Sequence, residues 1–229
     1  MPIRRTYAEH GDACRAANAL DLVGEKWTLV IVRELILGPR RFAELQTAVR
    51  GITPAVLTER LRSLQEAGIV KQVRPDGAGG QAYVATAWGR GLENVLRALG
   101  RWYSAGPDPV TTGEMTPDAM ILAMRTMAPA SPGMVPAVAL WLNDARRPDA
   151  PVRGYAARAT DDGALEVAAG EVTDPAATVT ATATAWSSVL LGGVPLDDAE
   201  RDGRVHVEGD RSAVVRLVEL FATPVSAVS

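Results

Sequence analysis

The chain has 229 residues, and 47% of them are apolar, which is enough for two domains with hydrophobic cores. No apolar run approaches the roughly 18 residues of a membrane-spanning helix, and the N-terminus lacks the apolar block of a signal peptide, so we expect a soluble cytoplasmic protein. A single cysteine, Cys14, excludes an intrachain disulfide, and two distant histidines make a metal site or a cofactor unexpected.

The net charge of -3 hides an uneven distribution along the chain. Residues 1–103 contain 15 Lys and Arg against 10 Asp and Glu, a net charge of +5, whereas residues 104–229 contain 9 against 17, a net charge of -8. Phosphate would attract the first part and repel the second. The pattern predicts two domains with different partners, 1–103 and 114–229, joined by a Pro- and Gly-containing linker at 104–113.

The first part begins with three predicted helices over residues 13–22, 26–37 and 41–49, followed by a turn at Gly51. A fourth helix is expected over residues 53–67. Thr53 is a favourable cap and Pro54 suits the first helical position, while Gly68 ends the helix. Two helices joined by a tight turn are typical of a helix-turn-helix motif, in which the N-terminal end of the second helix enters the major groove of DNA.

Two strands and one more helix complete the first part. Residues 69–74 and 81–85 have strand character and flank the turn sequence PDGAGG, which predicts a hairpin wing behind the recognition helix. Thr86 is expected to cap a helix that runs to Tyr103 and carries a stripe of apolar residues. Because little core remains for this helix to cover, we expect it to mediate dimerisation.

The candidate DNA contacts lie on the face of the fourth helix opposite its leucines and on the basic residues nearby. Arg62 and Thr58 are the best base readers, since Arg pairs with guanine edges and Thr contacts a base or a thymine methyl group; contact of Arg62 with phosphate alone stays open. Arg60 has an internal salt bridge as its alternative. The full candidate set comprises Arg40, Arg41, Thr53, Pro54, Ala55, Thr58, Glu59, Arg62, Lys71 and Arg74. The four basic residues outside the fourth helix are expected to contact phosphate or to lie on the solvated surface, and not to read bases.

The second part alternates strands and helices. Strands are predicted over residues 135–142, 152–160, 163–169, 176–181 and 204–207. Helices are predicted from Thr116-Pro117 onward and over residues 182–191, 197–201 and 211–222. The fold class is therefore α+β, a winged helix-turn-helix domain followed by an α+β domain with a mostly antiparallel sheet.

Several segments of the first part resemble the HxlR family of winged helix-turn-helix regulators, relatives of the MarR regulators. They are Cys14, LDLVGEKWTLVIVREL, GPRRFAEL, GITPAVLTERLRSLQEAGIV and TAWG, which together cover about residues 10–103. The resemblance implies a homodimer formed through the first and last helices and a pseudo-palindromic operator in double-stranded DNA. Ala55 stands where many members carry a basic or polar residue, and Ala82 stands where many carry Glu in the second wing strand. The operator sequence therefore does not carry over from the family.

The second part is similar to sterol-carrier-protein-like domains in the segments DDGALEVAAGEVTDPAATVTATATAWSSVLLGG and DGRVHVEGDRSAVVRLVELF. Such domains pack helices on a sheet around a cavity for lipids or other apolar molecules. A group of residues suited to an adaptable apolar pocket supports this reading: Met120, Met124, Met127, Met134, Trp141 and Trp186. An ordinary core is the alternative for each residue taken singly.

Cys14 has two interpretations. Several HxlR-type regulators use a cysteine at this position as a redox or electrophile sensor, which would require an exposed thiol of low pKa. The alternative is a small buried residue at a dimer contact.

We find no catalytic triad order, phosphate-binding loop or dinucleotide fingerprint, so no enzyme is expected. The predicted function is a homodimeric DNA-binding regulator whose operator affinity responds to an apolar molecule in the second domain. A thiol sensor acting through Cys14, with a second domain that only extends the dimer, is the alternative.

Overall fold

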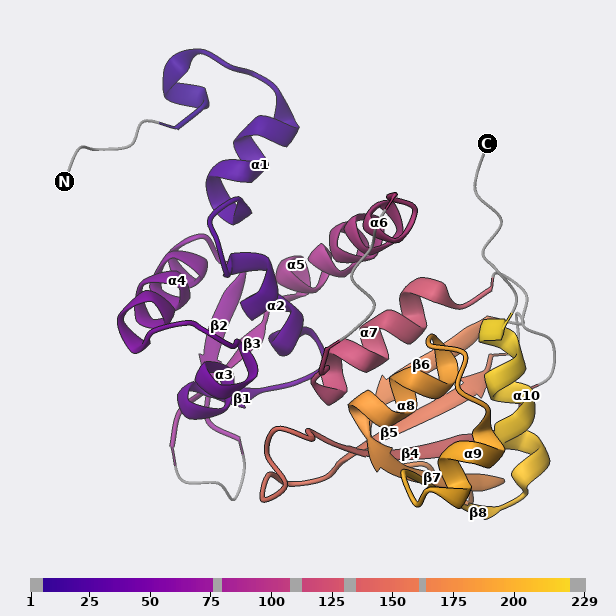
Figure 1. Ribbon diagram of the computed structural model, residues 1–229. Helices are drawn as coiled ribbons and strands as arrows, with labels where there is room; N and C mark the ends of the chain where they lie inside the picture. The colour runs from indigo at the N-terminus through magenta and orange to yellow at the C-terminus, as the bar shows by residue number, and fades with distance from the viewer. Residues whose placement is uncertain (1–5, 76–79, 108–112, 130–134, 161–163, 223–229) are drawn as a thin grey trace. The chain divides into compact units, whose positions relative to one another are not determined.

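The computed structural model describes residues 6–75, 80–107, 113–129, 135–160 and 164–222. The chain folds into two compact units, Met1–Leu96 and Arg97–Ser229 (Figure 1). The predicted linker, 104–113, starts where helix α6 ends at Ser104, and residues 108–112 lie outside the described part of the chain. The domain boundaries given above therefore stay a prediction.

The first unit is a winged helix-turn-helix fold, as predicted. After a short 3-10 turn at Ala8–His10, its elements are α1 (Arg15–Val23), α2 (Thr28–Ile36), β1 (Arg40–Arg41), α3 (Phe42–Ala48), α4 (Pro54–Glu66), β2 (Val70–Val73), β3 (Ala82–Ala85) and α5 (Ala87–Arg90). Helix α6 (Leu92–Ser104) begins in this unit and ends in the second.

The core of the first unit forms where α2 and α4 meet the small sheet. Leu57, Leu61 and Leu64 recur at helical spacing on α4 and are almost completely buried, together with Ile31 and Leu35 of α2. The three strands have the order β1-β3-β2 with antiparallel pairing, so β2 and β3 form the predicted hairpin. The predicted turn of this hairpin includes residues 76–79, which lie outside the described residues.

Two details of the first unit differ from the sequence-based expectation. Arg40 and Arg41 form a strand that pairs with Tyr83 and Ala82, and the third helix therefore starts at Phe42. The helix expected from Thr86 to Tyr103 is interrupted at Gly91, which separates α5 from α6. Glycine has the weakest helix propensity apart from proline, which explains why the interruption falls there.

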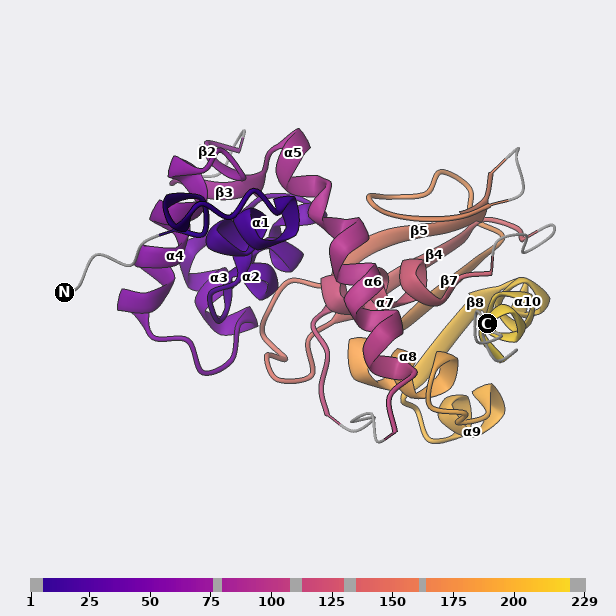
Figure 2. The same ribbon diagram turned by 90° about the horizontal axis from the view of Figure 1, so that it is seen from above.

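The second unit is an α+β fold around a five-stranded sheet. Its elements after α6 are α7 (Pro117–Met127), β4 (Val138–Asn143), β5 (Arg153–Ala159), β6 (Leu165–Ala169), β7 (Ala177–Thr182), α8 (Ala183–Leu190), α9 (Leu196–Arg201), β8 (Val205–Gly209) and α10 (Arg211–Ala222). The strand order is β6-β5-β4-β7-β8, and Figure 2 shows β5, β4, β7 and β8 side by side in that order. Of the four strand pairs only β4 with β7 is parallel, so the prediction of a mostly antiparallel sheet is confirmed.

One face of this sheet carries the core. Along β4, Val138, Leu140 and Leu142 are fully buried and alternate with less buried residues, as expected for a strand covered on one side. Tyr155 lies opposite Leu140 in the register and bonds to Asp118 of α7, which identifies the covered face as the helical side. Helices α7, α8 and α10 contact the strands of this sheet, and α8 contacts both of the others.

Candidate DNA-binding site

The helix-turn-helix is formed by α3, the turn at Gly51 and α4. Gly51 has a φ of 82°, a conformation that favours glycine, and a Cβ there would lie 3.4 Å from the ring of Trp27. The Oγ1 atom of Thr53 accepts a hydrogen bond of 3.3 Å from the backbone N–H of Val56, and Pro54 occupies the first helical position. Gly68, with a φ of 71°, ends the helix. The start and stop predicted for the recognition helix are therefore confirmed.

The polar face of α4 lies at the surface. All six candidate contact residues on α4 and its N-terminal cap are exposed, while the leucine face of the same helix is buried; the six are Thr53, Pro54, Ala55, Thr58, Glu59 and Arg62. The hydroxyl of Thr58 donates 2.9 Å back to the carbonyl of Pro54, which leaves its oxygen and its methyl group to face a partner. Helix α4 therefore has one buried apolar face and one face that is open to contact with another molecule.

Arg62 and Glu59 form an ion pair one turn apart on this face. The Nη2 atom of Arg62 lies 3.0 Å from each carboxylate oxygen of Glu59. The hydrogen bond and the negative charge of Glu59, together with the charge of Glu66, raise the pKa of Arg62 above its usual value. Arg62 is therefore a permanent cation held by a neighbouring carboxylate.

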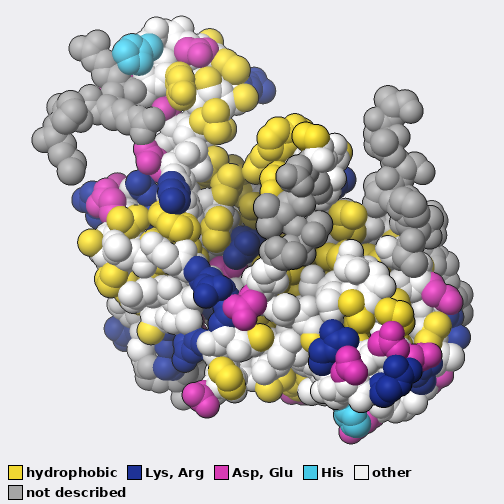
Figure 3. Space-filling view, in the orientation of Figure 1, with side chains coloured by type: hydrophobic (Ala, Val, Ile, Leu, Met, Phe, Trp, Pro, Cys, Tyr) yellow, Lys and Arg dark blue, Asp and Glu magenta, His cyan; other side chains and the backbone are white. Residues whose placement is uncertain are grey.

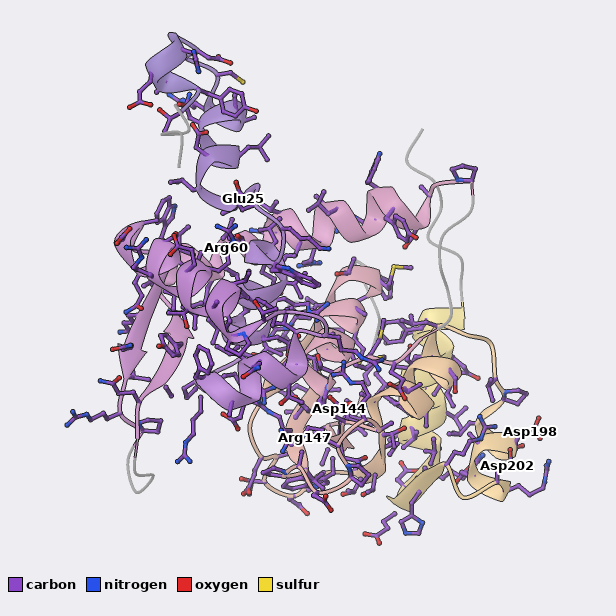
Figure 4. The ribbon with its side chains drawn as sticks, turned by 60° about the vertical axis from the view of Figure 1, so that its left-hand side comes forward. Glu25, Arg60, Asp144, Arg147, Asp198 and Asp202 are labelled. Atoms are coloured by element: carbon purple, nitrogen blue, oxygen red, sulfur yellow. The ribbon has the colours of Figure 1, made fainter. Side chains whose placement is uncertain are left out.

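Arg60 takes a structural role. Its Nη2 atom donates 3.1 Å to Glu25 Oε2, and the two side chains point toward one another in Figure 4. Arg60 is partly buried, with 23% of its side chain exposed. The internal salt bridge that the sequence left open for Arg60 is the one observed, and it ties α4 to the segment before α2.

The other basic candidates occupy the small sheet. Lys71 and Arg74 are exposed along β2 and directly after it, at the wing. Arg41 is exposed, and its backbone N–H donates 2.6 Å to Glu44, which caps the start of α3. Arg40 is half-buried in β1, so its side chain is less available to phosphate than the other three.

Sequence reasoning missed a set of hydrogen bonds that connects the end of α4 with the start of α5. Thr86 donates its hydroxyl to the carbonyl of Gly68 at 2.8 Å, accepts from the N–H of Gly89 at 3.0 Å, and donates its own N–H to Ile69 at 2.9 Å. A Cβ on Gly89 would lie 2.1 Å from the carbonyl oxygen of Ile69, so only glycine fits there. The motif TAWG was the available signal, and its role is to hold the end of α4 against β3 and α5.

Cys14 is exposed and lies just before the first residue of α1. The backbone N–H groups of Ala17 and Ala16 stabilise the thiolate and lower the pKa of Cys14, with a small opposing effect of desolvation. The backbone N–H of Cys14 itself donates 2.8 Å to Asp12. In this chain the thiol is accessible, unlike a cysteine packed in a core.

The residues proposed for a ligand pocket do not form one group. Met120 and Met124 of α7 and Trp186 of α8 are fully buried on the helical side of the sheet. Trp141 points to the opposite face, where a Cβ on Gly154 would meet its ring at 3.0 Å. Met127 is half-buried, and Met134 lies outside the described residues. Trp186 Nε1 is buried and donates to no acceptor in the described part of the chain.

Within the described ranges, no group of three or more metal-binding side chains occurs. The helices described here include none that is long and apolar enough to cross a membrane.

Comparison with known proteins identifies the first unit. Residues 22–109 match the family model of the HxlR-like helix-turn-helix. The chain is 32% identical over 96 residues to the transcriptional regulator YvaP of Bacillus subtilis, an alignment that covers 42% of this chain and 89% of YvaP. The chain belongs to the HxlR-like helix-turn-helix family. It is a transcriptional regulator of the HxlR and MarR type.

Other helix-turn-helix regulators show similar sequence identity to this chain. A helix-turn-helix regulator of Synechocystis is 37% identical over 92 residues, covering 40% of this chain and 68% of that protein. The regulator YodB of Bacillus subtilis is 31% identical over 96 residues, covering 42% and 86%. The structure of quinone-bound YodB aligns with 40% of this chain and 98% of its own at 27% identity and a TM-score of 0.36. Each of these three alignments covers 40–42% of this chain.

Proposed function

We propose that the protein binds an operator in double-stranded DNA as a homodimer, with α4 of each copy in the major groove. The observation that carries the proposal is the contrast between the two faces of α4, where the leucines are buried and Thr58, Glu59 and Arg62 are exposed. The exposed Lys71 and Arg74 supply phosphate contacts at the wing. Binding is then salt-dependent, since each phosphate contact releases condensed counterions.

The homodimer is supported by apolar side chains that α1 and α6 leave exposed (Figure 3). Helix α6 has no buried residue in the single chain, and 74% of Trp102 is exposed, along with parts of Val95, Leu99 and Tyr103. Leu20 of α1 is 53% exposed. A second copy that covers these side chains would bury apolar surface at about 25 cal/mol per Å².

The DNA-binding proposal is tested with duplexes selected from a random pool by the full-length protein. Arg62→Ala is expected to weaken binding to the selected DNA by about 1–3 kcal/mol, because an Arg–guanine pair is worth that much. Arg201→Ala is a matched control, since Arg201 forms the same i,i+3 pair with Asp198 on α9 of the second unit. Equal loss in both variants, measured by fluorescence anisotropy, would contradict the assignment of α4.

The finer part of the proposal concerns the second unit, which we expect to bind an apolar molecule that shifts operator affinity. The resemblance to sterol-carrier-like domains and the packing of α7, α8 and α10 on one face of a sheet support this reading. Met120, Met124 and Trp186 are the candidate lining residues on that side. A ligand changes DNA affinity only if it binds one arrangement of the dimer better than the other.

The ligand proposal is tested by measuring affinity for the selected DNA with and without three probes: dodecanoate, dodecanol and cholesterol. A change of at least tenfold with one of them, abolished by Trp186→Ala, is the expected result. Equal affinity with all three probes at saturating concentration would count against an apolar effector.

A second candidate signal is oxidation or alkylation of Cys14, favoured by its exposure and lowered pKa. With one cysteine in the chain, the chemistry is limited to a bridge between two copies, a mixed disulfide or a covalent adduct. The second unit would then only extend the dimer. Treatment with diamide or N-ethylmaleimide should change DNA affinity in the native protein and leave Cys14→Ser unchanged; a full response in Cys14→Ser eliminates this mechanism.

A further inference from the structure

The pair of Glu59 and Arg62 has a geometry that bears on which bases α4 recognises. Both oxygens of Glu59 lie 3.0 Å from the same nitrogen, Nη2 of Arg62, while Nε and Nη1 of Arg62 make no hydrogen bond to any described residue. The side chain of Arg62 is 64% exposed and that of Glu59 is 51% exposed. One nitrogen of the guanidinium, Nη2, is therefore held by Glu59, while Nε and Nη1 lie on the exposed face of the helix.

This ion pair contributes little to the stability of the fold, because exposed pairs on one helix are weak and screened by salt. Its effect is on the orientation of Arg62. An exposed arginine loses much rotational freedom when it binds, and a side chain already held in one direction loses less. Glu59 therefore prepares Arg62 for a partner that meets it in a fixed direction.

Glu59 also selects among possible partners. A phosphate bound by Arg62 would lie close to the carboxylate of Glu59 and be repelled by it. A guanine offers the acceptors O6 and N7 to Arg62, and a cytosine offers its N4 amino group to the carboxylate. A carboxylate has enough lone pairs to accept from Arg62 and from cytosine at once.

We infer that Glu59 is a positioning and specificity residue that directs Arg62 to a guanine and itself accepts from a cytosine in the same or the adjacent base pair. The inference rests on the proposed entry of α4 into the major groove. It predicts a G·C pair at a fixed place in each half of the operator, and it assigns to Arg62 a base contact in place of a phosphate contact.

The experiment selects duplexes from a random pool with the full-length protein and with its variants Glu59→Gln and Arg62→Ala. The native protein should enrich a half-site with one guanine common to all sequences. Glu59→Gln should reduce the preference for that G·C pair by about tenfold while binding to unselected DNA becomes stronger, since one negative charge is removed. Asp198→Asn breaks the equivalent pair on α9 and should change neither quantity.

The salt dependence of binding distinguishes a base contact of Arg62 from a phosphate contact of Arg62. Removal of a base contact relaxes one position of the half-site, whereas removal of a phosphate contact weakens binding to all sequences and lowers the salt slope by about one. The inference is wrong if Arg62→Ala lowers the salt slope and weakens binding to all sequences equally. It is also wrong if Glu59→Gln leaves the selected half-site unchanged. If the native protein enriches no sequence, the proposed DNA-binding function fails, and the inference fails with it.

Discussion

Gly89→Ala should destabilise the first unit far more than a change of one methyl group suggests. The added Cβ would lie 2.1 Å from the carbonyl oxygen of Ile69, where real contacts stay beyond 3.0 Å, so α5 must move by about 0.9 Å. Overpacking of this kind costs about 1–3 kcal/mol. The shift also strains the hydrogen bonds of Thr86 to Ile69 and Gly89, at roughly 1 kcal/mol each. Alanine regains about 1 kcal/mol of helix propensity, so the expected net loss is about 2–4 kcal/mol.

The measurement is urea unfolding followed by far-ultraviolet circular dichroism. Gly100→Ala is the matched control, because Gly100 is also a helical glycine but its Cβ would meet only Thr126 Cγ2 at 3.5 Å. That variant should gain about 0.5–1 kcal/mol. If Gly89→Ala unfolds at the same urea concentration as the native protein, the close approach of α5 to Ile69 is not a constraint and the reasoning is refuted.

Tyr155→Phe should cost the second unit about 1.5–3 kcal/mol, because the hydroxyl donates 2.6 Å to the buried carboxylate of Asp118. Tyr83→Phe, at an exposed hydroxyl on β3, should stay within about 0.5 kcal/mol of the native protein in the same thermal unfolding experiment. Burial raises the pKa of Asp144, but hydrogen bonds and positive charge from Arg146 outweigh it and lower the pKa overall. Its charged form therefore stabilises the fold at neutral pH, and this contribution is lost as the pH falls below the ordinary Asp value of about 3.9. Asp144→Asn should accordingly destabilise at pH 7, and the difference from the native protein should be smaller at pH 3; an equal difference at both pH values would contradict the assignment.

Much of the first unit was predictable because its signals are local. Thr53 and Pro54 mark the start of α4 and Gly68 marks its end, because these residue types are favoured at helix ends. The leucine spacing defines the buried face of the helix. The strand at Arg40–Arg41 was not predictable in this way. Two residues have no periodicity, and they form a strand only because Tyr83 and Ala82, some forty positions away in the sequence, supply its partner.

The sequence predicts which residues of α4 are exposed, but it does not predict the contacts that they make with other side chains. Exposure of Thr58, Glu59 and Arg62 follows from helical geometry, whereas the choice of Glu25 as the partner of Arg60 depends on how the segment before α2 folds back. In the second unit, composition suggested that Trp141 and Trp186 share a pocket. The strand alternation of β4 places Trp141 on the face away from the helices, and this could be known only once the register was fixed.

The parallel pairing of β4 with β7 has a consequence for how the protein folds. Strands β4, β5 and β6 pair in sequence order, and we expect these pairings to form first, because each closes a shorter loop than the pairing of β4 with β7. Strand β7 then joins β4 on its other edge, across the chain that contains β5 and β6. Pairings between distant segments close slowly because loop entropy is lost before the contact is gained. We therefore expect the first unit, with its local helical contacts, to fold while the sheet of the second unit is still incomplete, so that a newly made chain acquires its helix-turn-helix before the five-stranded sheet.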